Sequence, residues 1–272
     1  MLKRALLLLK RNPVIVLFYA GYMILDVLIL LLLYPKDINQ IMFDAEGLFS
    51  ISAYLTGMGK LLLAIFLLFL LSLIFLSGFG NLVREAVFSG RTSSAAFRTG
   101  IKSYFVRILL MMLLIIAFAF GGSLLIGIIT IPITILSVMG GASSAYSTTL
   151  IIMGITMLLL LIPMPFIILW LPAIFLEDTG VIQSLKGGAK AGRKNYWKLA
   201  LSLILLYLPG VVYTVLNYEA VSKGRLMTMG YMLLLLVSSV MSLIYIAYIF
   251  MVYHYYKIGI ITTDSSQRTG ND

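Results

Sequence analysis

The sequence contains no cysteine and a single histidine, His254. Without cysteine, the chain has no disulfides, iron–sulfur clusters or thiolate zinc sites. The common metal sites need several histidines or clustered carboxylates, and one histidine is too few. There is also no glycine-rich phosphate loop and no dinucleotide-binding fingerprint. We therefore expect no metal and no cofactor.

Charged residues are also scarce, at 11% of the chain, against about 25% in soluble domains. Hydrophobic residues make up 61% of the 272 residues, so too few polar side chains remain to cover a soluble core. The formal net charge is +10. Since the Lys and Arg residues lie between apolar runs, we expect them to face anionic membrane lipids, and we expect no nucleic acid partner.

Long apolar segments dominate what is present. A hydrocarbon core of about 30 Å is crossed by about 20 apolar residues in a helix. Six segments reach this length: 14–34, 55–79, 108–135, 149–176, 199–217 and 228–253. The sequence predicts an all-α, polytopic membrane protein with six transmembrane helices. These form a single domain over residues 1–261, followed by a polar cytoplasmic tail at 262–272.

The distribution of Lys and Arg predicts the orientation. If the N-terminus is cytoplasmic, 16 of the 20 Lys and Arg residues fall on the cytoplasmic side and 4 fall outside. Such a bias is typical of proteins that obey the positive-inside rule. We therefore predict a multi-pass protein of the cell membrane with both termini in the cytoplasm.

Residues 2–11 are predicted to form a short interfacial helix on the inner leaflet. Lys3, Arg4, Lys10 and Arg11 share one helical face, and leucines occupy the other. The apolar run that follows continues to Tyr34 without a small-residue cleavage site, so we expect a first span and not a signal peptide.

Two cytoplasmic loops, Gly90 to Leu110 and Glu177 to Leu203, resemble each other. Each has a turn with small polar residues, then a short basic helix rich in Gly and Ala. Each ends in an aromatic pair, Tyr104-Phe105 or Tyr196-Trp197, and the pairs lie 92 residues apart. We predict a parallel repeat of spans two–three and four–five. The alternative is that any cytoplasmic loop carries cations and interfacial aromatics.

The second loop also carries a family resemblance. It reads LPAIFLED, then Gly-Val, then Leu-Lys-Gly-Gly, then Arg-Lys-Asn-Tyr-Trp-Lys. This resembles the membrane domain that accompanies some bacterial glycerophosphoryl diester phosphodiesterases, and related stand-alone six-span proteins of unknown function. The resemblance implies a six-span membrane fold and a location in contact with lipid. It does not imply the enzyme, whose catalytic part is a separate soluble barrel with paired histidines.

A serine protease within the membrane is excluded by the predicted topology. Ser143 lies at the outer entrance to span four and His254 at the cytoplasmic end of span six, about 30 Å apart. A nucleophile and its base must lie within about 3 Å. We therefore expect no catalytic residues.

Asp26 and Lys60 are the candidate substrate-binding residues. An aspartate in the hydrocarbon is costly and usually faces a partner or a water-filled cavity. One hypothesis is an Asp26–Lys60 pair that lines a polar site open to the outside. In the alternative, Lys60 extends to the outer interface and Asp26 bonds to a hydroxyl on a neighbouring helix.

Proline marks candidate helix breaks at Pro163 and Pro165 in span four, and at Pro209-Gly210 in span five. Proline frees a backbone carbonyl and bends a helix, and breaks in two repeats can mark a transport site. Prolines are also common in membrane helices that have no such role.

The loop cations are candidate contacts for lipid headgroups or for a cytoplasmic protein partner: Arg98, Lys102, Lys186, Lys190, Arg193 and Lys194. Topology alone explains the same charges. The leading hypothesis is non-catalytic handling of lipid or an amphipathic solute, transporter-like or lipid-binding. The alternative is a membrane subunit that docks a cytoplasmic partner, such as an ABC-type ATPase.

The apolar face of residues 180–192 discriminates between these hypotheses. If the spans cover this face, it packs within the helical bundle. If it is exposed, we expect it to bind a partner. A homo-oligomer would pack through small residues such as Ala117 and Gly121.

Overall fold

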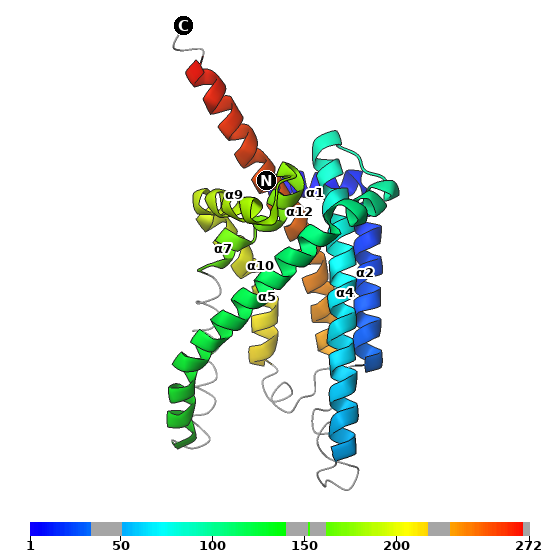
Figure 1. Ribbon diagram of the computed structural model, residues 1–272, viewed down its shortest axis with the longest axis vertical. Coiled ribbons are helices and arrows are strands. Elements are labelled where there is room, and N and C mark those ends of the chain that lie inside the picture. Colours follow the sequence, from blue (N-terminus) through cyan, green and yellow to red (C-terminus); the bar gives the residue numbers. More distant parts are fainter. Residues whose placement is uncertain (34–50, 140–151, 153–161, 217–228, 269–272) are drawn as a thin grey trace. The chain divides into compact units, whose positions relative to one another are not determined.

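The computed structural model describes residues 1–33, 51–139, 152, 162–216 and 229–268 (Figure 1). Within these ranges every regular element is a helix, which confirms the all-α prediction for this part of the chain. The helices are α1 (Leu2–Arg11), α2 (Pro13–Leu33), α4 (Ile51–Ser89), α5 (Ser94–Met139), α7 (Met164–Ile167), α8 (Trp170–Glu177), α9 (Val181–Lys194), α10 (Tyr196–Leu216) and α12 (Met229–Arg268).

Five of these helices, α2, α4, α5, α10 and α12, are long and apolar enough to cross a membrane. They contain or closely match five of the six predicted spans, because the thickness of the hydrocarbon sets the length of an apolar run. The fourth predicted span, 149–176, falls largely outside the described residues. Its described part is α7 and α8, a shorter apolar stretch.

Two predicted boundaries differ from the structure. The short helix expected in the first loop is not separate from span three, because α5 runs without interruption from Ser94 to Met139. No helix-ending residue separates the two parts, whereas Asn195 ends α9 before α10 begins. At the other end of the chain, α12 continues to Arg268, past residue 262 where we expected the polar tail to begin.

The chain divides into two compact units, and each is described by itself. The first comprises Met1–Phe105 and Ser202–Asp272, and the second comprises Val106–Leu201. In the first unit, α2 packs on α4 through aromatic side chains. The rings of Tyr22 in α2 and Phe75 in α4 stack at 4.2 Å between centroids, and the ring of Tyr19 in α2 lies 5.9 Å from that of Phe79 in α4.

A buried asparagine ties the start of the first unit together. Asn12, between α1 and α2, donates from Nδ2 to the Gly90 carbonyl at 3.3 Å and accepts the Thr92 N–H at 2.9 Å. Glu85 accepts from the Thr92 hydroxyl at 2.6 Å. These bonds satisfy polar groups that would be costly to bury unpaired, and they fasten the α1–α2 junction to the turn between α4 and α5.

The predicted helix at residues 2–11 is present as α1, and it packs against α12. Its buried side chains are Ala5, Leu8 and Leu9, whereas Leu2 and Leu6 stay exposed. The Arg4 guanidinium lies over the Tyr255 ring of α12, 4.5 Å from the centroid.

Candidate functional site

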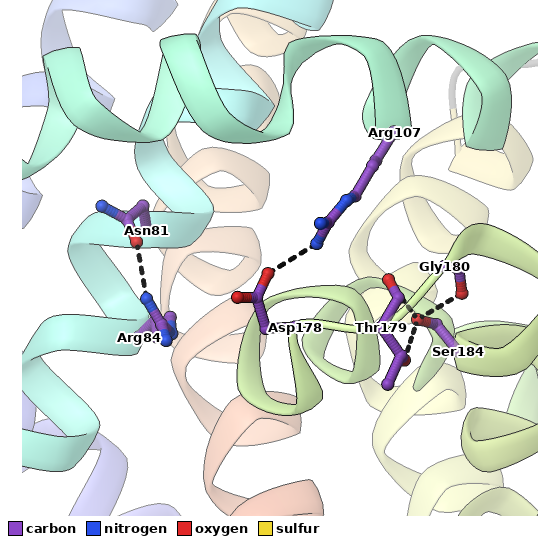
Figure 2. A network of polar contacts seen from close by, with 7 residues as sticks. All are labelled: Asn81, Arg84, Arg107, Asp178, Thr179, Gly180 and Ser184. Atoms are coloured by element: carbon purple, nitrogen blue, oxygen red, sulfur yellow. Dashed lines mark hydrogen bonds and ion pairs between the residues drawn. The ribbon is translucent and has the colours of Figure 1, made fainter.

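The turn between α8 and α9 sets the position of α9 in the second unit. Asp178 adopts a left-handed backbone conformation (φ 52°) and ends α8. The Ser184 hydroxyl then bonds back to the Gly180 carbonyl at 3.0 Å and to the Thr179 hydroxyl at 2.9 Å (Figure 2). The indole N–H of Trp170 donates to the Val181 carbonyl at 2.8 Å, which joins α8 to the first turn of α9.

Two glycines let α9 lie directly on the backbone of α7 and α8. A Cβ atom at Gly188 would be 2.8 Å from Trp170 N and 2.9 Å from Leu169 C. A Cβ atom at Gly192 would overlap the carbonyl oxygen of Pro165. Ser184 and Ala191 are buried on the same face. The covered face of α9 is thus lined by small residues, whereas the larger apolar side chain of Ile182 is 55% exposed.

The opposite face of α9 is exposed and basic. Lys186, Lys190 and Arg193 recur at spacings of four and three, so they form one stripe along the helix. We call these three residues the α9 stripe. Lys194 and Gln183 are exposed beside it.

The α9 stripe continues into apolar side chains at the start of α10. Trp197 is 76% exposed and Leu201 is 60% exposed, and Lys198 lies between them. Cations, then an aromatic side chain, then aliphatic side chains are the order found where a helix passes from the headgroups into the hydrocarbon. The exposed side chains therefore change from basic to apolar at the α9–α10 junction, as they would across a membrane interface.

One ion pair lies at the turn that precedes α9. Arg107 donates to Asp178 at 2.5 Å, which joins α5 to the α8–α9 turn (Figure 2). Both side chains are partly exposed, so the pair contributes about 0–1 kcal/mol to stability. Sequence reasoning missed it, because nothing in the spacing of two residues so far apart indicates that they meet.

The first unit shows a related arrangement on α5. Arg98 and Lys102 are exposed one turn apart, whereas Ala96 and Gly100 are buried. A Cβ atom at Gly100 would lie 2.7 Å from the Ser77 carbonyl oxygen. The Asn81 side chain donates to the Ala96 carbonyl at 2.8 Å and accepts from Arg84 at 3.5 Å (Figure 2).

Asp26 and Lys60 do not lie at the same height along the axes of α2 and α4. The hydroxyls of Tyr22 and Ser72 lie 3.2 Å apart, which sets the antiparallel register of α2 and α4. In that register Lys60 lies about 12 Å further along the axis than Asp26. Asp26 is half-buried and Lys60 is exposed, and none of the ion pairs among the described residues joins them. Their role in binding stays a prediction.

The predicted helix breaks differ from one another. Pro163 and Pro165 lie at the start of α7, a helix of only four residues that ends before α8 begins. By contrast, α10 continues through Pro209 and Gly210 to Leu216. Proline removes one backbone donor, and a membrane helix tolerates this where its surroundings satisfy the freed carbonyl.

A comparison with protein-family models gives a match over residues 1–257 to a domain of unknown function, DUF7847. The chain belongs to the DUF7847 family. No curated protein and no solved structure gives a significant match. The match includes α1 and α9, so both helices belong to the DUF7847 domain. It does not name the phosphodiesterase membrane domain.

The close contact at Gly192 predicts a sharp sensitivity to a single methyl group. Gly192→Ala places a Cβ on the Pro165 carbonyl, so α9 must shift away from α7. Because the chain has no native cysteine, Ser184→Cys provides the sole thiol on the buried face. We expect this thiol to react with maleimide faster in the Gly192→Ala background. Gly180→Ala is the matched control, since nothing lies within 4 Å of its Cβ. Equal rates in both backgrounds would contradict the contact.

Proposed function

We propose that this DUF7847 protein is a non-catalytic, multi-pass protein of the cell membrane that binds anionic lipid headgroups at its cytoplasmic face. The α9 stripe supplies the binding groups. The observation that carries the proposal is the division of α9 into two faces. The small-residue face is buried against α7 and α8, and the face left exposed carries Lys186, Lys190 and Arg193.

The surroundings of the α9 stripe favour a lipid as the partner. Trp197 and Leu201 extend the surface into an apolar region, and such a boundary matches the headgroup level of a bilayer. Each cation near an anionic surface contributes about 1 kcal/mol. Three such charges together contribute about 3 kcal/mol, which is roughly a hundredfold in affinity.

The topology we propose is six spans with both termini in the cytoplasm. Five helices of the described part are long enough to cross the bilayer, and the positive-inside count favours this orientation. The sixth span would occupy 149–176, where α7 and α8 form its cytoplasmic end.

We also propose that the two loops are a parallel repeat. Gly100 packs on Ser77 and Gly192 packs on Pro165. The glycines lie 92 residues apart and their contact partners 88 residues apart. The difference is one helical turn, which is the extra length of the second loop. Two glycine contacts in equivalent places support a duplicated hairpin.

The alternative function is the docking of a cytoplasmic protein. An exposed apolar face on α9 would favour it. Ile182 is exposed there, but the exposed side chains that follow it along the helix, Lys186, Lys190 and Arg193, are cations.

Binding of phosphatidylglycerol to the purified protein tests the proposal. In detergent micelles we expect Lys186→Gln/Lys190→Gln/Arg193→Gln to weaken its apparent affinity by up to roughly a hundredfold, given about 1 kcal/mol per charge. Binding of phosphatidylcholine should not change. The matched control is Lys186→Arg/Lys190→Arg/Arg193→Lys, which keeps the charge and should keep the affinity.

Unchanged affinity in the glutamine variant would rule out the α9 stripe as the binding surface. If a stoichiometric soluble protein copurifies with the unaltered chain and is lost from the glutamine variant, the docking alternative is correct instead.

The proposed topology predicts which single cysteines a membrane-impermeant maleimide reaches. In intact cells, Ser143→Cys in the outer loop should react, whereas Ser94→Cys should react only after permeabilisation. The native chain has no cysteine, so each variant reports one position. Reaction of both, or of Ser94→Cys alone, would overturn the six-span arrangement or its orientation.

A further inference from the structure

The N-terminal helix α1 ends in the same way as α9. Asn12 and Asn195 are the C-terminal caps of α1 and α9. The side-chain amide of each asparagine donates to the carbonyl four residues earlier, Leu8 at 2.9 Å and Ala191 at 3.1 Å. Each backbone N–H donates to the carbonyl three residues earlier, at 3.1 Å for Asn12 and 3.2 Å for Asn195. A long apolar helix begins at the next residue in both cases, α2 at Pro13 and α10 at Tyr196.

The buried positions of the two helices also correspond. Counted back from the capping asparagine, the third, fourth and seventh residues are buried in each helix. In α1 these are Leu9, Leu8 and Ala5, and in α9 they are Gly192, Ala191 and Gly188. The helix that each covers differs, because α1 packs on α12, and α9 packs on α7 and α8.

The cations correspond as well. The first, second and ninth residues before each asparagine are basic and exposed. In α1 these are Arg11, Lys10 and Lys3, and in α9 they are Lys194, Arg193 and Lys186. The basic residues, the capping bonds and the burial pattern thus agree at the same positions, although the buried residues are larger in α1 than in α9. Arg4 is different, because it stacks on Tyr255 of α12.

Because of these correspondences, α12, α1 and α2 match α8, α9 and α10 helix for helix. In each set a short basic helix packs on one helix and is followed directly by a long apolar helix. In the first unit the last helix of the chain, α12, takes the place that α8 has before α9, although no peptide bond joins α12 to α1 (Figure 1). Two helices that are far apart in the sequence, α12 and α1, thereby form with α2 a further arrangement of a long apolar helix, a short basic helix and a second long apolar helix.

We infer that α1 carries a second binding surface for anionic phospholipid headgroups, formed by Lys3, Lys10 and Arg11 and equivalent to the α9 stripe. The inference rests on the function proposed for α9. Leu2 and Leu6, which are 55% and 45% exposed, flank these cations. Exposed leucines beside cations suit a helix that lies in the headgroup region with its leucines in the acyl boundary. A lipid surface accommodates both kinds of side chain.

Native mass spectrometry of the full chain tests this surface. The protein is extracted in a mild detergent that contains equal amounts of phosphatidylglycerol and phosphatidylcholine, and the retained lipids are counted. Lys3→Gln/Lys10→Gln/Arg11→Gln is compared with the α9 glutamine variant and with the two combined. We expect about twofold less retained phosphatidylglycerol in either variant alone, and no preference over phosphatidylcholine in the combination, since each charge acts locally at the membrane surface.

Two controls separate charge from folding and orientation. Lys3→Arg/Lys10→Arg/Arg11→Lys keeps the charge and should retain the lipid. Arg4→Gln removes one charge from α1 outside the proposed surface and should also retain it. The Ser94→Cys thiol, placed in each background, checks that the protein keeps its orientation.

The outcomes distinguish this inference from the proposed function. If the α1 variant retains as much phosphatidylglycerol as the unaltered chain while the α9 variant loses it, the second surface does not exist and the proposed function stands. If neither variant loses lipid, both are wrong. Loss of lipid in the charge-keeping control as well would mean that α1 acts through its fold and not through its cations, which overturns the inference. A soluble protein that is lost with the α1 cations would make this face a protein interface instead.

Discussion

The organisation of the second unit depends on the direct contact between the backbone of α9 and the backbones of α7 and α8. Gly188 and Gly192 make this approach possible, because a Cβ at either position would collide with main-chain atoms. Close packing of this kind is how helices associate when a hydrophobic driving force is weak. It holds α9 at the ends of the apolar helices, and it determines which face of α9 is left exposed.

The exposed charges follow from that contact. Once the small residues are buried, the helical period leaves Lys186, Lys190 and Arg193 on the opposite side. The same logic holds for Arg98 and Lys102, opposite Ala96 and Gly100, and for the cations of α1, opposite Ala5, Leu8 and Leu9. In each case a short basic segment is packed through small or apolar side chains, and its cations are presented next to the start of an apolar helix.

Much of the fold was predictable because the thickness of the hydrocarbon core sets the length of the apolar helices. The described spans match predicted apolar segments, and α1 was expected from the amphipathic pattern of residues 2–11. The fusion of the first loop helix with span three was not predicted, since loop composition alone does not show that no residue ends α5. The Arg107–Asp178 pair and the level of Lys60 relative to Asp26 depend on how helices pack and on their register, which apolar periodicity does not specify. The candidate cations of α9 are exposed, and their contact with lipid or with a partner stays a prediction. Only the structure shows that the opposite face of α9 packs on α7 and α8 through glycines.

The most direct test of the account is the depth of α9 in a bilayer. A spin label at Gln183→Cys, the sole thiol of the chain and exposed beside the α9 stripe, can be measured in nanodiscs by its collisions with oxygen and with a water-soluble nickel complex. The account predicts a label at the level of the lipid phosphates, and a shallower position when phosphatidylcholine replaces phosphatidylglycerol. A label in bulk water, with a depth that does not depend on lipid charge, would contradict the claim that α9 is held against the headgroups.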